Sequence, residues 1–356
     1  MGFHNHGVLG LGIAHLVQSW LRSVRALLAA FLCAPKLWLA PLLLAACTPT
    51  PFGTPTPYPG HPIITSGYFT LPDGARLPYR IYLAQGPLKA VVLALHGYTD
   101  SRDAWTYLAQ TLSPHGIELI APDQSSFGAT ANRGHWPGTA TLIEEAAAVA
   151  AQVRAQNPGV KFYLAGESMG GGELMILGAG RNAPQADGYI LTAPAVWGGD
   201  TMPWSYRASV WALDRLTPGY RLYSKHVHVK ASDNRAALIA FGQDPLTIHA
   251  PRVDQLAGLF DLMNQALTAC GSFHVHALIL YGGHDELVPK QAMRECWRAI
   301  PATAPVQLAY YPPDYHLIPR DNERAPPNAD ILAFIQGQTL PSGAPSAATV
   351  FLASGD

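Results

Sequence analysis

The residues with the clearest chemical potential form a G-x-S-x-G sequence at positions 166–170, with Ser168 at its centre. The apolar run 160–165 that precedes it is typical of a buried strand, and the Gly-rich, then apolar segment 170–179 is typical of a helix. A sharp turn between such a strand and such a helix holds a serine on a strained bend, with its hydroxyl exposed. We therefore predict that Ser168 is a nucleophile, with a plain Gly-rich turn as the alternative.

A serine hydroxyl needs a base within hydrogen-bond reach and a third group that orients this base. Where a serine is held on such a turn, an acid and then a histidine follow it in the chain. The acid candidate is Asp285, which follows the apolar run 277–281 in a loop before a helix-starting proline. Glu286 is the rival acid, and an Asp in such a loop can also be a helix cap. The base candidate is His316, because no other histidine follows Asp285.

Two backbone N–H groups are also required where negative charge develops on the substrate. One is expected from Met169, the residue after the nucleophile, and the other from Tyr98, in the loop after the apolar run 90–95. We expect His96 to brace this loop rather than act as a base. Glu167 is expected to brace the serine turn, since adjacent residues on a tight turn point apart.

Together these segments resemble the monoacylglycerol lipase and lysophospholipase branch of the α/β-hydrolases. The resemblance covers residues 63–337 and is carried by His96-Gly97, Gly166-Glu167-Ser168-Met169-Gly170-Gly171, Asp244-Pro245-Leu246, Asp285-Glu286-Leu287-Val288-Pro289 and Tyr315-His316. It implies a serine esterase for monoacylglycerols or lysophospholipids, with Ser168, Asp285 and His316 as the triad. It also implies Tyr98 and Met169 as oxyanion donors. Glu167 replaces the more usual histidine, and the loop 122–130 departs from the usual pattern, which leaves the acyl-chain preference open.

The amino-acid composition limits the kinds of molecule that the chain is expected to bind. Of its 356 residues 49% are hydrophobic and 13% charged, as expected for one large domain with appendages. A net charge of −1 without a basic run argues against nucleic acid. The 14 histidines form no zinc-type pattern, so we predict neither a metal nor a cofactor, and a lipid or other ester as substrate. The alternatives are a serine aminopeptidase or an acyltransferase on the same triad, and a non-catalytic envelope lipoprotein.

Residues 1–46 are expected to be a lipoprotein signal segment. Basic residues precede the apolar run 37–44, and the small residues before Cys47 resemble a bacterial lipobox. The resemblance implies cleavage before Cys47 and attachment of diacylglycerol to its sulfur, which anchors a protein to a membrane. Because Thr48 takes the place of a retention aspartate, the expected location is the outer membrane, facing the periplasm. An uncleaved membrane helix and an ordinary secretory signal are the alternatives.

The remaining segments predict how these residues are positioned. Residues 47–62 are rich in Pro and Thr, which predicts an extended linker. Strand and helix patterns then alternate, which predicts an α/β fold with a mostly parallel sheet and helices on both faces. The predicted core covers 63–194 and 272–338, and the interval 195–271 lacks this alternation and is too long for a loop, so it predicts a mainly helical cap. A flexible tail is expected over 339–356.

Two cysteines remain after Cys33 and Cys47. In an oxidising compartment Cys270 and Cys296 could pair, because one precedes the strand before Asp285 and the other lies in the helix after it. Two separate buried thiols are the competing interpretation.

Overall fold

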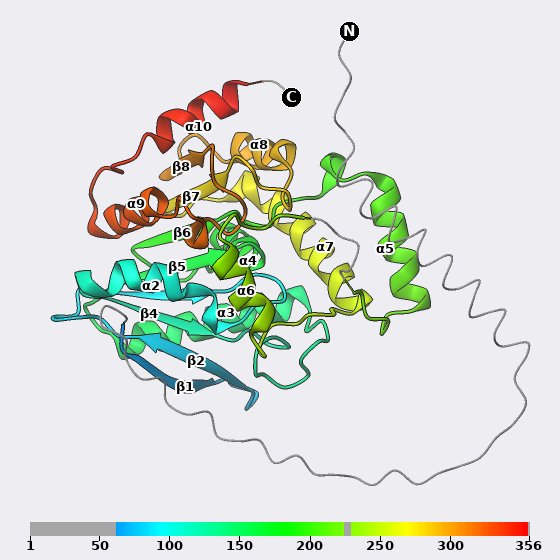
Figure 1. The fold of residues 1–356 in the computed structure, drawn as a ribbon, viewed down its shortest axis with the longest axis horizontal. Helices are drawn as coiled ribbons and strands as arrows, with labels where there is room; N and C mark the ends of the chain where they lie inside the picture. The colour runs from blue at the N-terminus through cyan, green and yellow to red at the C-terminus, as the bar shows by residue number, and fades with distance from the viewer. Residues whose placement is uncertain (1–61, 224–228, 355–356) are drawn as a thin grey trace, which may run out of the picture. The chain divides into compact units, whose positions relative to one another are not determined.

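A twisted eight-stranded sheet organises the part of the chain that the computed structural model describes, residues 62–223 and 229–354 (Figure 1). The strands are β1 (Ile64–Thr70), β2 (Arg76–Tyr82), β3 (Ala90–Leu95), β4 (Ile117–Pro122), β5 (Lys161–Glu167), β6 (Gly188–Thr192), β7 (Ala277–Gly282) and β8 (Val306–Tyr311). They pair in the order β1-β2-β4-β3-β5-β6-β7-β8. The β1–β2 and β2–β4 pairs are antiparallel and all the others are parallel, so β3, β5, β7 and β8 end at the same edge.

Helices cover both faces of this sheet, as parallel strands require. Alternate residues of β3 belong to two apolar cores, with Val91, Leu93 and Leu95 in one and Ala90, Val92 and Ala94 in the other. The first core is completed by α3 (Thr139–Gln156), α4 (Met169–Ala179), α8 (Lys290–Ala299) and α10 (Ala344–Ala353). The second is completed by α2 (Thr106–Leu112) and α9 (Ala325–Gln336). The predicted α/β architecture is confirmed.

Three helices are inserted between β6 and β7. These are α5 (Trp204–Leu216), α6 (Arg235–Gln243) and α7 (Val253–Ala269). Helix α7 packs on α4 through buried residues that include Leu262 and Ala266, and α5 in turn packs on α7 (Figure 1). Because α5 buries only Val210 and leaves Trp204 and Trp211 exposed, it contributes little to the core beneath it.

The C-terminal segment differs from the flexible tail predicted over 339–356. Helix α10 lies against β8 and α8, and its Phe351 is buried. The ring of Phe351 stacks on Tyr310, with centroids 4.5 Å apart, and meets the edge of Trp297 at 5.5 Å. Tertiary packing, with Phe351 as its largest contact, therefore holds this short helix against the core.

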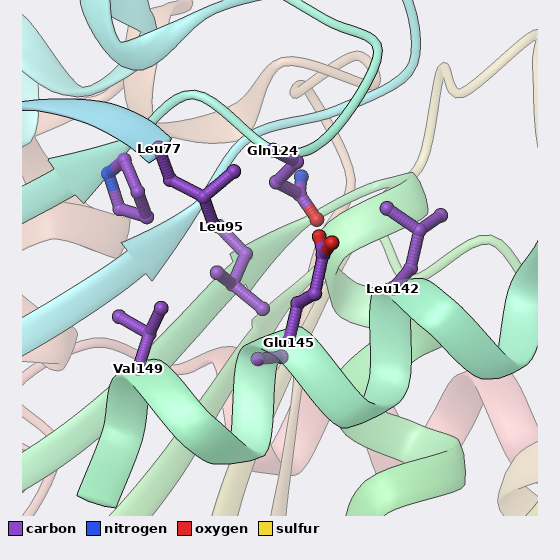
Figure 2. Close-up of a pocket in the computed structure, with 8 residues that line it drawn as sticks. Leu77, Leu95, Gln124, Leu142, Glu145 and Val149 are labelled. Carbon is purple, nitrogen blue, oxygen red and sulfur yellow. The ribbon is translucent and has the colours of Figure 1, made fainter. Parts of the chain in front are cut away.

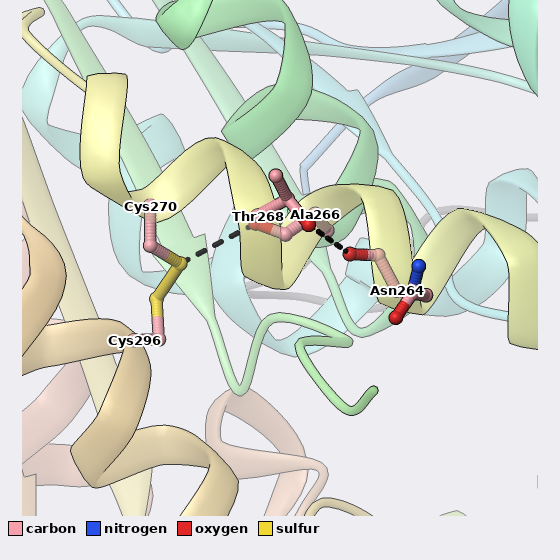
Figure 3. The surroundings of a disulfide bond; sticks show 5 residues. All are labelled: Asn264, Ala266, Thr268, Cys270 and Cys296. Atoms are coloured by element: carbon pink, nitrogen blue, oxygen red, sulfur yellow. Dashed lines mark hydrogen bonds between the residues drawn. A yellow bond between two sulfur atoms is a disulfide. The ribbon is translucent and has the colours of Figure 1, made fainter. Parts of the chain in front are cut away.

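A disulfide joins the inserted helices to the core (Figure 3). Cys270 begins the 3₁₀ turn (Cys270–Ser272) at the end of α7, and its Cα lies 5.3 Å from that of Cys296 on α8. Pairing of these two cysteines was left open by the sequence, and the structure resolves it in favour of the disulfide.

Candidate active site

Ser168 occupies the turn between β5 and α4 with a left-handed backbone, at φ +54°. A Cβ atom on Gly166 would come 2.4 Å from the carbonyl oxygen of Gly170. A Cβ atom on Gly170 would come 2.3 Å from the carbonyl oxygen of Leu95. The two glycines are therefore required for the turn to pack against its own helix and against β3. The Ser168 N–H also donates to the Thr192 carbonyl at 3.0 Å, which fixes the turn to β6.

Asp285 and His316 meet above the ends of β7 and β8. The Nδ1 of His316 lies 2.8 Å from Oδ2 of Asp285, and both side chains are buried. The other carboxylate oxygen accepts the N–H groups of Leu287 and Val288 at 2.8 and 2.9 Å, so the acid is fixed in orientation. The rival Glu286 instead accepts the backbone N–H of Lys230. The structure thus brings His316 together with Asp285 and not with Glu286.

The charge on His316 is controlled by its carboxylate neighbours. Burial lowers the pKa of the imidazole, but the charge and hydrogen bond of Asp285, followed by the charges of Glu167 and Asp321, outweigh it and raise the pKa overall. Since a carboxylate only accepts, Nδ1 is the donor to Asp285 and Nε2 is left as the base. Within residues 62–223 and 229–354, the half-buried Ser168 hydroxyl makes no hydrogen bond, and the one ion-pair partner of the His316 ring is Asp285.

The two predicted oxyanion donors belong to separate segments next to Ser168. Met169 is the first residue of α4, where helical N–H groups have no intrahelical acceptor. Tyr98 follows Gly97, whose Cα is so close that an added Cβ would lie 3.2 Å from the Ser168 Cβ. In the part of the chain that the structure describes, neither the Tyr98 N–H nor the Met169 N–H has an acceptor. Neither donor is committed to another group of the described chain.

His96 braces the loop that carries Tyr98. Its ring is fully buried, Nδ1 lies 2.8 Å from the Gly97 carbonyl, and Nε2 accepts the Gln124 N–H at 3.1 Å. Burial lowers the pKa of this imidazole, which keeps it neutral. Both ring nitrogens are occupied, so His96 is not available as a base.

A small cavity lies between the start of the loop 122–130 and α3 (Figure 2). Figure 2 shows the Gln124 side chain pointing toward the Glu145 carboxylate, with apolar walls that include Leu77, Leu95 and Leu142. Gln124 donates its amide to the His96 carbonyl at 2.8 Å, and Ser125 donates its hydroxyl to Glu145 at 2.8 Å. These contacts hold the loop that replaces the usual pattern at 122–130. None of the residues that line this cavity is a predicted catalytic residue.

Two residues of the site were not found from the sequence, Arg320 and Asp100. Arg320 donates from Nη2 to Oδ2 of Asp100 at 2.5 Å and also to Oε1 of Glu167. Glu167 therefore braces the turn, as expected, but through a buried ion pair with a residue 153 positions away. The one signal available in the sequence was the position of Arg320, four residues after His316.

The fold and the arrangement of these loops define an α/β-hydrolase. Residues 86–323 match the family described as serine aminopeptidase, S33, and the chain belongs to this family. Over 267 residues it is 24% identical to a monoacylglycerol lipase of Mycolicibacterium smegmatis, covering 74% of this chain and 93% of the relative.

Two solved structures share the fold. The crystal structure of the Paleococcus ferrophilus monoacylglycerol lipase superposes with a TM-score of 0.62 at 21% identity, covering 74% of this chain and 99% of that one. A soluble variant of the monoglyceride lipase of Saccharomyces cerevisiae, in complex with a substrate analogue, gives a TM-score of 0.65 at 19% identity. That match covers 82% of this chain and 99% of the yeast chain.

The predicted signal segment and Cys47 lie outside the described residues, as does nearly all of the linker. Across 62–223 and 229–354, no helix combines the length and hydropathy needed to cross a bilayer. Histidine, cysteine, aspartate and glutamate side chains in the same ranges form no group of three suited to a metal ion.

Proposed function

We propose that this hydrolase, which acts on ester bonds, cleaves the carboxylic ester of a monoacylglycerol or lysophospholipid through an acyl-enzyme. The observation that carries the proposal is the buried contact between His316 and Asp285, on loops at the same sheet edge as the Ser168 turn. The name of the Mycolicibacterium relative supports the choice of substrate, and so does the substrate analogue bound to the yeast enzyme.

The proposed reaction begins when Nε2 of His316 takes the proton of the Ser168 hydroxyl and the serine oxygen attacks the ester carbonyl carbon. The negative charge on the carbonyl oxygen is received by the N–H groups of Tyr98 and Met169. Collapse of this intermediate breaks the bond to the alcohol, which leaves with the proton held by His316. Water then attacks the acyl-serine by the same steps and releases the fatty acid, and Asp285 stabilises the charged imidazole throughout.

The surroundings of the proposed oxyanion donors favour an acyl chain. The side chain of Met169 is buried in an apolar cluster with Phe127, and Ile248 and Leu262 of the insertion belong to the same cluster. The ring of Tyr98 packs against this cluster. Apolar side chains of core and insertion thus meet beside the nucleophile, as a lipid substrate requires.

The family description raises a second candidate, an aminopeptidase, which needs a free carboxylate for the substrate amine. Asp254 is the acidic residue of the insertion that lies near enough to act on Tyr98. Burial raises the pKa of the Tyr98 phenol most, and the charge of Asp254 raises it further. Its two oxygens already accept three hydrogen bonds from Arg252, at 2.6 to 3.0 Å. A carboxylate neutralised in this way is a poor clamp for an ammonium group, so the ester substrate is favoured.

The experiment compares the purified chain with Ser168→Ala on monoacylglycerol, lysophospholipid and an aminoacyl amide. We expect ester cleavage by the native chain, and a fall of roughly 10⁴- to 10⁶-fold in kcat for the variant. A fluorophosphonate probe should label Ser168 and leave the variant unlabelled, while exposed Ser66→Ala behaves as the native chain. Full activity in Ser168→Ala contradicts the proposal, and cleavage of the amide alone selects the aminopeptidase.

We also propose that the chain is lipid-anchored through Cys47 in the bacterial outer membrane, facing the periplasm. The lipobox-like sequence before Cys47 supports this proposal. Metabolic labelling with a radioactive fatty acid should mark the native chain and Cys33→Ser but not Cys47→Ser. Equal labelling of all three proteins counts against the anchor.

A further inference from the structure

Three loops of the site converge on one buried guanidinium. Arg320 ends the 3₁₀ turn (Ile318–Arg320) that follows His316, and it is 5% exposed. One of its partners, Glu167, precedes the nucleophile, and the other, Asp100, lies two residues after Tyr98. The histidine loop, the serine turn and the loop of the oxyanion donor are therefore joined at a single side chain.

The two carboxylates compensate for the burial of this cation. Burial opposes the charge of Arg320, but Asp100 and Glu167 outweigh it and raise the pKa of the guanidinium further. Burial raises the pKa of Glu167, and the charge of Arg320 offsets only part of this rise, so the pKa stays above its ordinary value. When both carboxylates are ionised, they leave a formal charge of −1 beside His316 after the guanidinium is counted. Removing the arginine would leave two buried carboxylates without a counter-charge.

Each carboxylate is also tied to its own loop. Asp100 accepts the Ser101 N–H at 2.8 Å through its second oxygen, and its own N–H donates to the Gly97 carbonyl at 3.2 Å. Glu167 is the last residue of β5, so its backbone continues directly into Ser168. A displacement of Arg320 would therefore reach the atoms that hold the nucleophile and the oxyanion loop.

We propose that Arg320 is a positioning residue that clamps the histidine loop to the serine turn and to the oxyanion loop, and so sets the geometry in which His316 meets Ser168. The proposal rests on the triad proposed above. Arg320 itself takes no proton and touches no reacting atom. It acts through Glu167 and Asp100, which both accept from its Nη2. A lysine ammonium lies one covalent bond nearer the backbone than Nη2, so lysine restores the charge but not the position of the donor.

The first experiment measures kcat and KM of the full-length chain for one p-nitrophenyl ester after Arg320→Met and Arg320→Lys. Displacements of about 1 Å near a reacting centre cost on the order of 10²-fold in rate. We expect kcat of Arg320→Met to fall by about that factor, with KM within twofold, and Arg320→Lys to recover only part of the loss. The rate of acylation by a fluorophosphonate should fall in parallel, because it depends on the same serine and histidine.

The matched control is Arg294→Met, which removes a second buried arginine that lies on α8 and contacts the C-terminal helix. Arg294 is 9% exposed, and its guanidinium binds the Phe351 carbonyl and the Ser354 hydroxyl of the C-terminal helix. At a temperature where both variants are folded, Arg294→Met should keep the native kcat. If both variants lose kcat equally, the effect is one of stability and the positioning role is overturned.

The second experiment tests the charge of the clamp through Glu167→Gln. The groups that face His316 are Asp285, Glu167 and Asp321, and Glu167 is one of those that raise its pKa. Removing one negative charge should move the acid limb of the kcat/KM profile to lower pH, an effect that a purely structural brace does not produce. This variant carries the test if Arg320→Met fails to fold, and an acid limb at the native pH together with native kcat would overturn the proposal. If Ser168→Ala loses activity but Arg320→Met keeps the native kcat, this inference is overturned while the proposed function stands.

Discussion

Two regions of the molecule each bury an arginine, and they use it differently. We call the loops that carry Tyr98, Ser168, Asp285 and His316 the catalytic edge. There Arg320 is bonded to carboxylates, and the contacts that join the loops to one another through Arg320, Asp285 and His316 are polar. These contacts act between segments that are distant in sequence and carry few apolar residues of their own.

The second region, the C-terminal corner, consists of β8, α8 and α10. Its arginine, Arg294, donates to the Phe351 carbonyl at 3.1 Å and lies over the Phe351 ring at 4.5 Å. Stacked aromatic rings and the disulfide at Cys296 complete the packing. Contacts of this kind stabilise the fold without setting the position of any reacting atom. We therefore expect damage at the edge to change activity, and damage at the corner to change stability.

The largest expected effect is at the catalytic edge. Asp285→Asn should lower kcat by about 10⁴-fold, because an amide stabilises the wrong imidazole tautomer and cannot balance its charge. The change in its free energy of unfolding in urea should be far smaller than the change in the activation free energy of the reaction. Glu286→Gln is the control, since this carboxylate bonds a backbone N–H and not His316. If Glu286→Gln is the variant that loses activity, the acid has been assigned to the wrong neighbour.

The elements of the edge could be predicted from the sequence because their signals are local. Glycines at 166 and 170 mark the turn at Ser168, and the apolar runs before Tyr98 and Asp285 form the expected strands β3 and β7. Backbone crowding and strand burial are decided within a few residues, so spacing alone reveals them.

The contacts that were missed are set by distant residues. Asp100 and Arg320 are 220 positions apart, and no periodicity relates them. Helix α10 is rich in alanine but follows Pro and Gly residues, and one buried ring, that of Phe351, fixes it to β8. Such a segment becomes ordered only when its tertiary partners are in place, which the sequence of the segment does not encode.

An effect of intermediate size is expected at the corner. The disulfide closes a loop across a sequence separation of 26, which corresponds to about 3.5 kcal/mol of loop entropy at 25 °C. Cys270→Ala with Cys296→Ala should lose a free energy of unfolding of that order, while kcat/KM stays within twofold. Reductant should lower the stability of the native chain to that of the variant and leave the variant unchanged. A large fall in kcat/KM would remove the distinction between the two regions.

The smallest expected effect, counted per pH unit, is a pH dependence of stability that originates at the edge. Burial, followed by the charges of Asp321, Asp233 and Glu323, raises the pKa of Asp314 to about 8. Between the unfolded pKa of about 4 and this value, the native state binds one proton more than the unfolded state. Stability should therefore fall as pH rises through this window, by at most about 1.4 kcal/mol per pH unit.

Asp314→Asn tests this dependence, because an amide carries no titrating proton. Urea unfolding at pH 5, 6, 7 and 8 should give a flatter line for Asp314→Asn than for the native chain. The double cysteine variant should instead give the native slope of unfolding free energy against pH, at a lower free energy throughout. The disulfide that it removes carries no group that titrates in this range. Equal slopes for the native chain and Asp314→Asn would mean that Asp314 is already ionised in the folded state. The histidine loop would then hold a buried negative charge two residues from His316. The candidate counter-charge would be Lys230, whose ammonium group donates to the hydroxyl of the adjacent Tyr315.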